Sequence, residues 1–168
     1  MSLKVTTQVT SPLKIQNTFK QLSVAATELN SASDGLADAI LMLDDTLKRL
    51  NLGVSAWVTV SGNDDEDGDW WSRELGYTRI ADKWGIALKD ASGHYSNPDR
   101  DSVEKWLFND APRWMRVESV GKIPDLLEAL LKQAEDTTKK IKAKTDEALA
   151  LVQAVNKTVE EAQPAERK

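Results

Sequence analysis

Leucine recurs every seven residues along the first third of the chain, and this spacing is the strongest constraint on the fold. The row is Leu22, Leu29, Leu36, Leu43 and Leu50, and a second row three positions earlier is Phe19, Ala26, Ser33, Ile40 and Leu47. An α-helix brings two such rows together on one side, which is the pattern of a coiled coil. Pro12 suits the first turn of a helix and Gly53 suits its end. The spacing predicts a helical arm over residues 12–52, with a kink or loosening at the small polar residues 31–35.

The last part of the chain repeats the pattern. Its rows are Leu127, Ala134, Ile141, Ala148 and Val155, and Leu131, Thr138, Thr145, Val152 and Val159. Pro124 and Asp125 are typical of a helix start. We therefore expect a second helical arm over residues 122–161, and disordered ends at residues 1–11 and 162–168.

Two arms of equal length that flank a compact insert should fold back as an antiparallel, coiled-coil-like hairpin, with Leu50 beside Leu127 and Asp34 near Lys142. The seam contains many Ala, Ser and Thr residues, which bury little area, so a lone hairpin would be marginal. We therefore expect a homodimer in which two hairpins form a four-helix bundle. Its seam would consist of Leu22, Leu29, Leu36, Ile40, Leu43, Leu47, Leu127, Ile141, Val152 and Val155.

The middle of the chain, residues 53–121, has a different composition. It holds all six Trp residues and seven of the eight Gly residues. Alternation predicts strands over 54–60, 75–80 and 84–88, with a turn at 91–94. Residues 102–108 form either a fourth strand or a helical turn, and a short helix should run from Pro112 to Val120. The predicted class is α+β, with a small antiparallel sheet of three or four strands and a short helix inserted between the arms.

The net charge of −5 belongs to this middle segment. Residues 51–121 carry eight basic and thirteen acidic side chains, whereas both flanks are balanced. Five of the acids fall within residues 64–69. A pI near 5.0 argues against non-specific nucleic-acid binding, which depends on a basic surface.

The acidic segment resembles a calcium-binding loop in its spacing. With Asn63 as the first position of the loop, carboxylates follow at alternate positions, a glycine permits the sharp turn, and an acid stands at the twelfth position. The ligands would be Asn63, Asp65, Asp67, Asp69 and Glu74. Against this, a strand precedes the segment where a helix should, and Asp, Asn and Gly are also ordinary loop residues. Calcium is thus a possible cofactor, and a solvated hairpin loop is the simpler interpretation.

Aromatic and basic residues of the middle segment are candidates for contacts with a protein partner. Trp70 and Trp71 are adjacent and should point to opposite faces of a strand, so that one of them is exposed. Trp57, Trp84 and Trp106 fall on different strands and would form a core layer or a stacking platform if they shared a face. The candidate partner-binding residues are Trp70, Trp71, Tyr77, Arg113 and Arg116.

Catalytic patterns are sparse. The chain has no cysteine, and its one histidine, His94, is expected to be exposed in a turn. The leading hypothesis is a non-enzymatic interaction or scaffold protein that dimerises through its arms and presents the acidic, Trp-rich middle segment to a protein partner. The alternatives are a regulatory domain that binds calcium or a small ligand through residues 63–74, and a hydrolase with a pair of carboxylates.

The same features suggest where the protein works. The first residues, Met1 to Val5, lack the apolar core of a signal peptide, and no apolar run approaches the roughly 18 residues that span a bilayer. The lack of cysteine suits a reducing compartment. We expect a cytoplasmic protein with no membrane contact.

Overall fold

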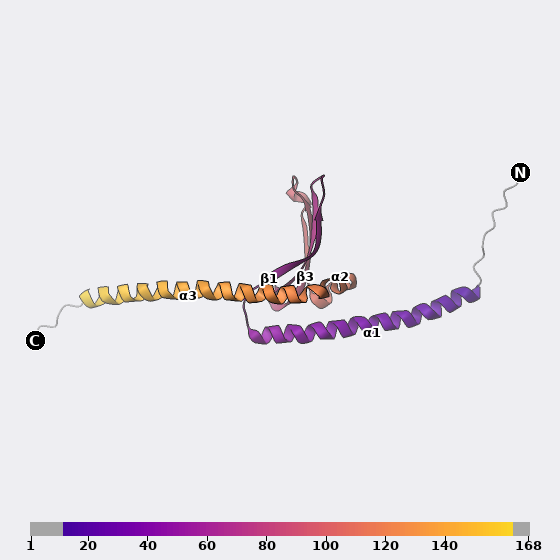
Figure 1. The fold of residues 1–168 in the computed structure, drawn as a ribbon, viewed down its shortest axis with the longest axis horizontal. Coiled ribbons are helices and arrows are strands. Elements are labelled where there is room, and N and C mark those ends of the chain that lie inside the picture. The colour runs from indigo at the N-terminus through magenta and orange to yellow at the C-terminus, as the bar shows by residue number, and fades with distance from the viewer. Residues whose placement is uncertain (1–11, 163–168) are drawn as a thin grey trace, which may run out of the picture. The chain divides into compact units, whose positions relative to one another are not determined.

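The computed structural model describes residues 12–162, which belong to two compact units divided between Asp45 and Thr46. The elements run α1, β1, β2, β3, β4, α2, α3, with short 3₁₀ turns at Pro98–Arg100, Phe108–Asp110 and Val120–Lys122 (Figure 1). The predicted disordered ends, 1–11 and 162–168, lie outside the described residues except for Ala162, the last residue of α3.

Helix α1 (Pro12–Leu50) is continuous over 39 residues. It passes through residues 31–35 without a break, so the predicted loosening is wrong. The helix ends as predicted, because Asn51 and Gly53 both take positive φ angles, at 47° and 63°.

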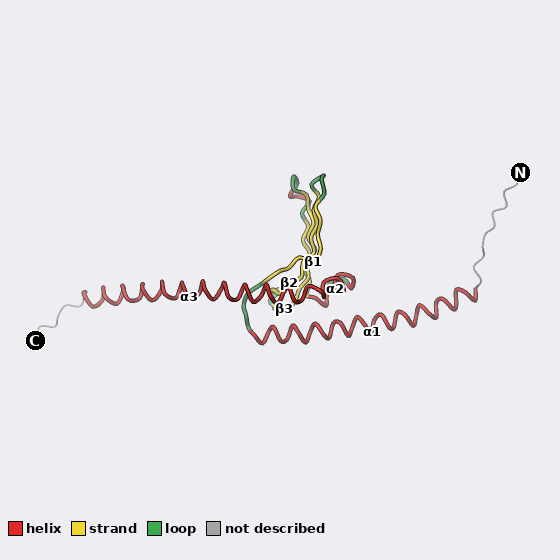
Figure 2. Tube along the Cα trace, in the orientation of Figure 1, coloured by secondary structure: helices red, strands yellow, loops and turns green. Residues whose placement is uncertain are grey.

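Four antiparallel strands form one sheet in sequence order: β1 (Ala56–Asp64), β2 (Asp69–Ile80), β3 (Lys83–His94) and β4 (Ser102–Leu107) (Figure 2). The α+β class is confirmed, and residues 102–107 form the fourth strand. Strands β2 and β3 are longer than predicted. Residues 91–94 belong to β3, so the predicted turn there is wrong, and the chain turns only after His94.

The connection between β2 and β3 is a hairpin turn. Ala81 and Asp82 both have positive φ, at 45° and 65°. Two successive positive φ angles match the right-handed twist of the flanking strands, which makes a two-residue turn possible. This turn lies at one end of the sheet, and the β1–β2 and β3–β4 connections lie at the other end, farther from α3 (Figure 2). We call this second end the tip, comprising residues 63–71 and 92–101.

The strand register divides the core from the opposite face. Leu75 pairs with Leu88, and Tyr77 pairs with Ile86, so these four buried side chains share one face of the sheet, the Leu75 face. The predicted short helix is α2 (Arg113–Ser119), and its Met115 is also buried.

Helix α3 (Ile123–Ala162) contributes to the same unit as the sheet and packs against β1 and β2. Leu126 and Leu130 are 0% and 2% exposed, while the seam residue next to each, Leu127 and Leu131, is exposed. The core therefore continues past residue 121, where we expected the arm to begin. The first turns of α3 belong to the core, and the rest of the helix extends beyond it (Figure 1).

The three strand tryptophans do not share a face. By register, Trp84 and Trp106 lie on the Leu75 face, and the Trp84 ring stacks on Tyr77 with 5.5 Å between centroids. Trp57 pairs with Gly76 and lies on the opposite face, where the Lys89 ammonium is 4.9 Å from its ring centroid. A single aromatic platform across the strands is therefore excluded.

Candidate functional site at the tip of the sheet

The β1–β2 loop is held by its own first carboxylate. Asp65 Oδ1 accepts hydrogen bonds from the backbone N–H groups of Asp67 and Asp69, at 3.1 and 2.9 Å. The Gly68 N–H donates to the Asp65 carbonyl at 3.1 Å, and the φ of 91° at Gly68 favours glycine. The loop is an Asx turn that closes within five residues. A short sequence containing Asp and Gly is therefore sufficient to connect β1 to β2.

A second set of bonds joins this loop to the β3–β4 connection. The Tyr95 N–H donates to the Gly68 carbonyl at 3.0 Å, and His94 Nε2 lies 3.0 Å from the Asp67 carbonyl. His94 Nδ1 accepts from the Ser96 N–H at 3.1 Å, so in the neutral ring the proton on Nε2 donates to Asp67. His94 is therefore half-buried and bridges two loops, and the predicted exposed turn histidine is wrong.

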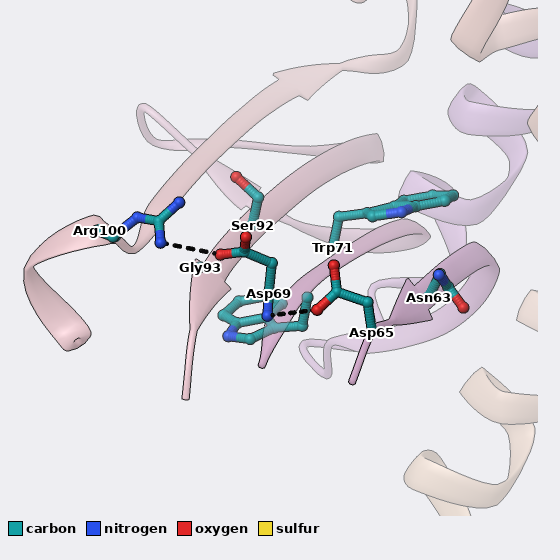
Figure 3. A pocket seen from close by; sticks show the side chains of 8 residues that line it. Asn63, Asp65, Asp69, Trp71, Ser92, Gly93 and Arg100 are labelled. Atoms are coloured by element: carbon teal, nitrogen blue, oxygen red, sulfur yellow. Dashed lines mark hydrogen bonds and ion pairs between the residues drawn. The ribbon is translucent and has the colours of Figure 1, made fainter. Parts of the chain in front are cut away.

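The tip contains a pocket of about 320 Å³ (Figure 3). Its lining comes from all three long strands and from the Pro98–Arg100 turn. The lining residues are Asn63, Asp65, Asp69, Trp70, Trp71, Ser92, Gly93 and Arg100. Arg100 Nη1 lies 3.1 Å from Asp69 Oδ1, and this ion pair joins the turn to the start of β2.

Arg73 stacks between two tryptophans beside this pocket. Its guanidinium carbon is 4.5 Å from the centroid of the Trp71 ring and 4.4 Å from that of Trp114 on α2. Asp90 and Glu118 lie 3.9 and 3.7 Å from its nitrogen atoms. Stacked rings and paired carboxylates together favour a planar cation.

Sequence reasoning missed Arg73 and Trp114. A usable signal is helical spacing, because Met115 and Ser119 are buried four residues apart on α2. Trp114 and Glu118 are also four apart and therefore share the neighbouring face of the helix. Trp114 is 50% exposed, although its ring contacts Arg73.

The five proposed calcium ligands are not brought together. Asn63, Asp65 and Asp69 line the pocket, whereas the exposed Asp67 contributes its backbone carbonyl to His94. Glu74 forms an ion pair with Lys89, and lies five residues along β2 from Asp69, or about 17 Å at the rise of a strand. Among residues 12–162 the structure has no group of three or more His, Cys, Asp or Glu side chains placed to hold a metal ion.

The five proposed partner-binding residues have different environments. Trp70 and Trp71 are half-buried at the tip and pair with Gly93 and Ser92, so they point to opposite faces as predicted. Neither is exposed, so the prediction that one of them would be is wrong. Tyr77 is only 2% exposed and packs in the core, so its assignment to a partner surface is wrong. The reason is period-two alternation, because Tyr77 shares the face of Leu75.

The two arginines are not among the residues that line the tip pocket. Arg113 is exposed at the start of α2, and Arg116 is half-buried one turn later.

No family model matches the chain, and neither the curated proteins nor the solved structures that we compared with it give a match. Within residues 12–162, no helix is both long and apolar enough to cross a membrane. The function therefore has to be argued from the side chains themselves.

Proposed function

We propose that the chain is a non-enzymatic protein-interaction module, which dimerises through its two long helices and presents the tip to a protein partner. The observation that carries this proposal is an exposed apolar row on α3 with heptad spacing. Ile141 is 61% exposed, and Leu131, Val152, Val155 and Val159 are exposed on the same two rows. At 1.5 Å per residue α3 is about 60 Å long, far longer than the core needs.

Long apolar rows of this kind are unfavourable in water unless another surface covers them. Each exposed Ile or Val side chain contributes roughly 1.5–3 kcal/mol when it is fully buried. Helix α1 has the same period and nearly the same length, and its Leu22 and Leu29 are exposed, Leu36 and Leu43 half-buried, and Ile40 and Leu47 buried. The equal lengths of α1 and α3 support a hairpin of the two helices. A second copy of this hairpin is the simplest surface that would cover the apolar side chains still exposed on the first.

The charge distribution supports the same assembly. The flanks that contain α1 and α3 are each neutral overall, so two copies of these helices can approach without net repulsion. The excess negative charge lies in the middle segment and chiefly at the tip. The assembling part and the presented part of the chain are thus separate in sequence and in charge.

Sedimentation equilibrium at micromolar concentrations tests the dimer. We expect twice the chain mass for the unmodified protein and a single chain mass for the double variant Ile141→Glu, Val152→Glu. The double variant places two carboxylates in the seam on α3 of each chain. The matched control is Ala143→Glu, Ala150→Glu, which adds the same charge to the opposite side of α3 and should remain dimeric. A monomeric unmodified chain at these concentrations would overturn the proposal.

A further inference from the structure

The tip pocket combines an aromatic wall with an excess of negative charge. Two carboxylates and one guanidinium line it, a formal charge of −1. Figure 3 shows the Trp71 indole with the Asp65 carboxylate beside it, and the Asp69 carboxylate on the side toward Arg100. A monocation would neutralise the lining, and a Trp face attracts a cation more strongly than any other side-chain ring.

Each of the two carboxylates has an oxygen to offer. Asp65 Oδ1 is used by the loop and Asp69 Oδ1 by Arg100. The Oδ2 atoms of Asp65 and Asp69 take no part in these contacts. A ligand with several N–H donors in one plane could use both of them.

The structure already holds such a group against the same tryptophan. Arg73 stacks on Trp71 with Asp90 and Glu118 nearby, but Arg73 itself does not line the pocket. Arg73 comes from the core side of Trp71, and the lining residues Asp65 and Asp69 lie on the tip side. The pocket therefore resembles the Arg73 environment in having an indole and two carboxylates, and the one guanidinium that the chain supplies to it, that of Arg100, pairs with Asp69.

We propose that the tip pocket binds the guanidinium of an arginine side chain in a basic segment of the partner protein. The guanidinium would lie against Trp71 and donate to Asp65 and Asp69. Arginine suits the site better than lysine, because its head group is planar, weakly hydrated and able to donate in two directions at once. This inference rests on the proposed presentation of the tip to a protein partner, and it names the chemistry of that partner.

A peptide source is favoured over free arginine because the negative charge continues outside the pocket. Asp64 at the end of β1 and Glu66 and Asp67 on the loop that follows are exposed and do not line the pocket. These acids would attract further basic residues beside the bound arginine. The attraction would raise the association rate, and salt would weaken it. The loop is fixed by its own hydrogen bonds, so little ordering should be required on binding.

Isothermal titration of the full chain tests the proposal with four ligands: the peptide acetyl-Ala-Arg-Arg-Ala-amide, the same peptide with lysine, the same peptide with citrulline, and Nα-acetylarginine amide. Citrulline keeps the planar shape but is neutral. We expect the arginine peptide to bind at least about tenfold more tightly than either of the other peptides. Equal affinity for the arginine and citrulline peptides would overturn the proposal. Tighter binding of Nα-acetylarginine amide than of the arginine peptide would overturn the claim that the arginine belongs to a partner protein.

The variant Asp65→Asn keeps the oxygen that accepts the loop hydrogen bonds and removes the charge. We expect it to weaken the arginine peptide about tenfold, whereas the matched control Asp82→Asn, at the other end of the sheet, should leave the affinity unchanged. Asp82 is exposed, and asparagine tolerates its positive φ. Equal affinities in the two variants would contradict the assignment to the pocket. Sedimentation of the same samples separates this result from a failure of dimerisation.

Discussion

The ring of Trp57 lies directly across Gly76, its partner on the neighbouring strand. A Cβ added at Gly76 would overlap the ring, with Cζ3 of Trp57 only 2.8 Å away. Glycine at this position therefore makes room for the largest side chain of β1, and it also leaves Trp57 within reach of the Lys89 ammonium.

Gly76→Ala should destabilise the sheet for this reason. The Trp57 ring would have to move or the strands would have to separate, which costs about 1–3 kcal/mol in a packed site. Urea unfolding followed by tryptophan fluorescence measures the change. The control is Gly121→Ala, which meets nothing within 4 Å and should change the free energy of unfolding by less than about 0.5 kcal/mol. Equal effects of the two substitutions would contradict the close packing at Gly76.

Replacing Arg73 tests the stack beside the pocket. Arg73→Met removes the cation between Trp71 and Trp114 but keeps an unbranched side chain, and we expect a loss of about 1–2 kcal/mol. Arg79→Met is the matched control, because Arg79 is more exposed and its ion pair with Asp82 is on the surface, where such pairs contribute little. Thermal unfolding of both variants gives the comparison, and a similar loss for Arg79→Met would show that the stack has no special role.

The strand register explains why part of the tip escaped prediction from the sequence. Asn63, Asp65 and Asp69 are close in sequence, so a predicted loop over these residues was enough to place them near one another in space. Ser92 reaches the pocket only because it pairs with Trp71, and Arg100 reaches it only because the β3–β4 connection turns back toward Asp69. Pairing between distant strands depends on the whole sheet, which no local pattern contains.

The longer strand β2 accounts for one further error. Residues 69–74 carry Trp and acidic side chains on both faces, so apolar alternation becomes visible only from Leu75. We therefore placed Glu74 in a loop, where it could close around an ion with Asp65. Extended backbone instead carries Glu74 to its ion pair with Lys89. The positions of the helices were easier to predict from the sequence, because heptad rows are local patterns. Helices α1 and α3 begin and end close to the predicted residues.

Adjacent leucines on α3 provide a sharp test of which side faces the core. Leu126→Ala removes a side chain that is fully buried, and we expect a loss of about 2–5 kcal/mol. Leu127→Ala should change unfolding by less than about 1 kcal/mol, since that side chain is partly exposed. Both should be measured by urea unfolding in the Ile141→Glu, Val152→Glu background, so that association does not contribute to stability. The reverse order of effects would mean that the helix packs on its seam side.

The Asp65 carboxylate should be important for the fold of the tip as well as for its charge, and two substitutions separate these roles. Asp65→Ala removes the acceptor for the Asp67 and Asp69 N–H groups, and we expect it to destabilise the protein by about 1 kcal/mol. Asp65→Asn keeps an oxygen at that place and should unfold like the unmodified chain, while losing affinity for the arginine peptide. Amide hydrogen exchange should show faster exchange at Asp67 and Asp69 in the alanine variant alone. If the asparagine variant also loses this protection, the loop depends on the charge of Asp65 rather than on its hydrogen bonds.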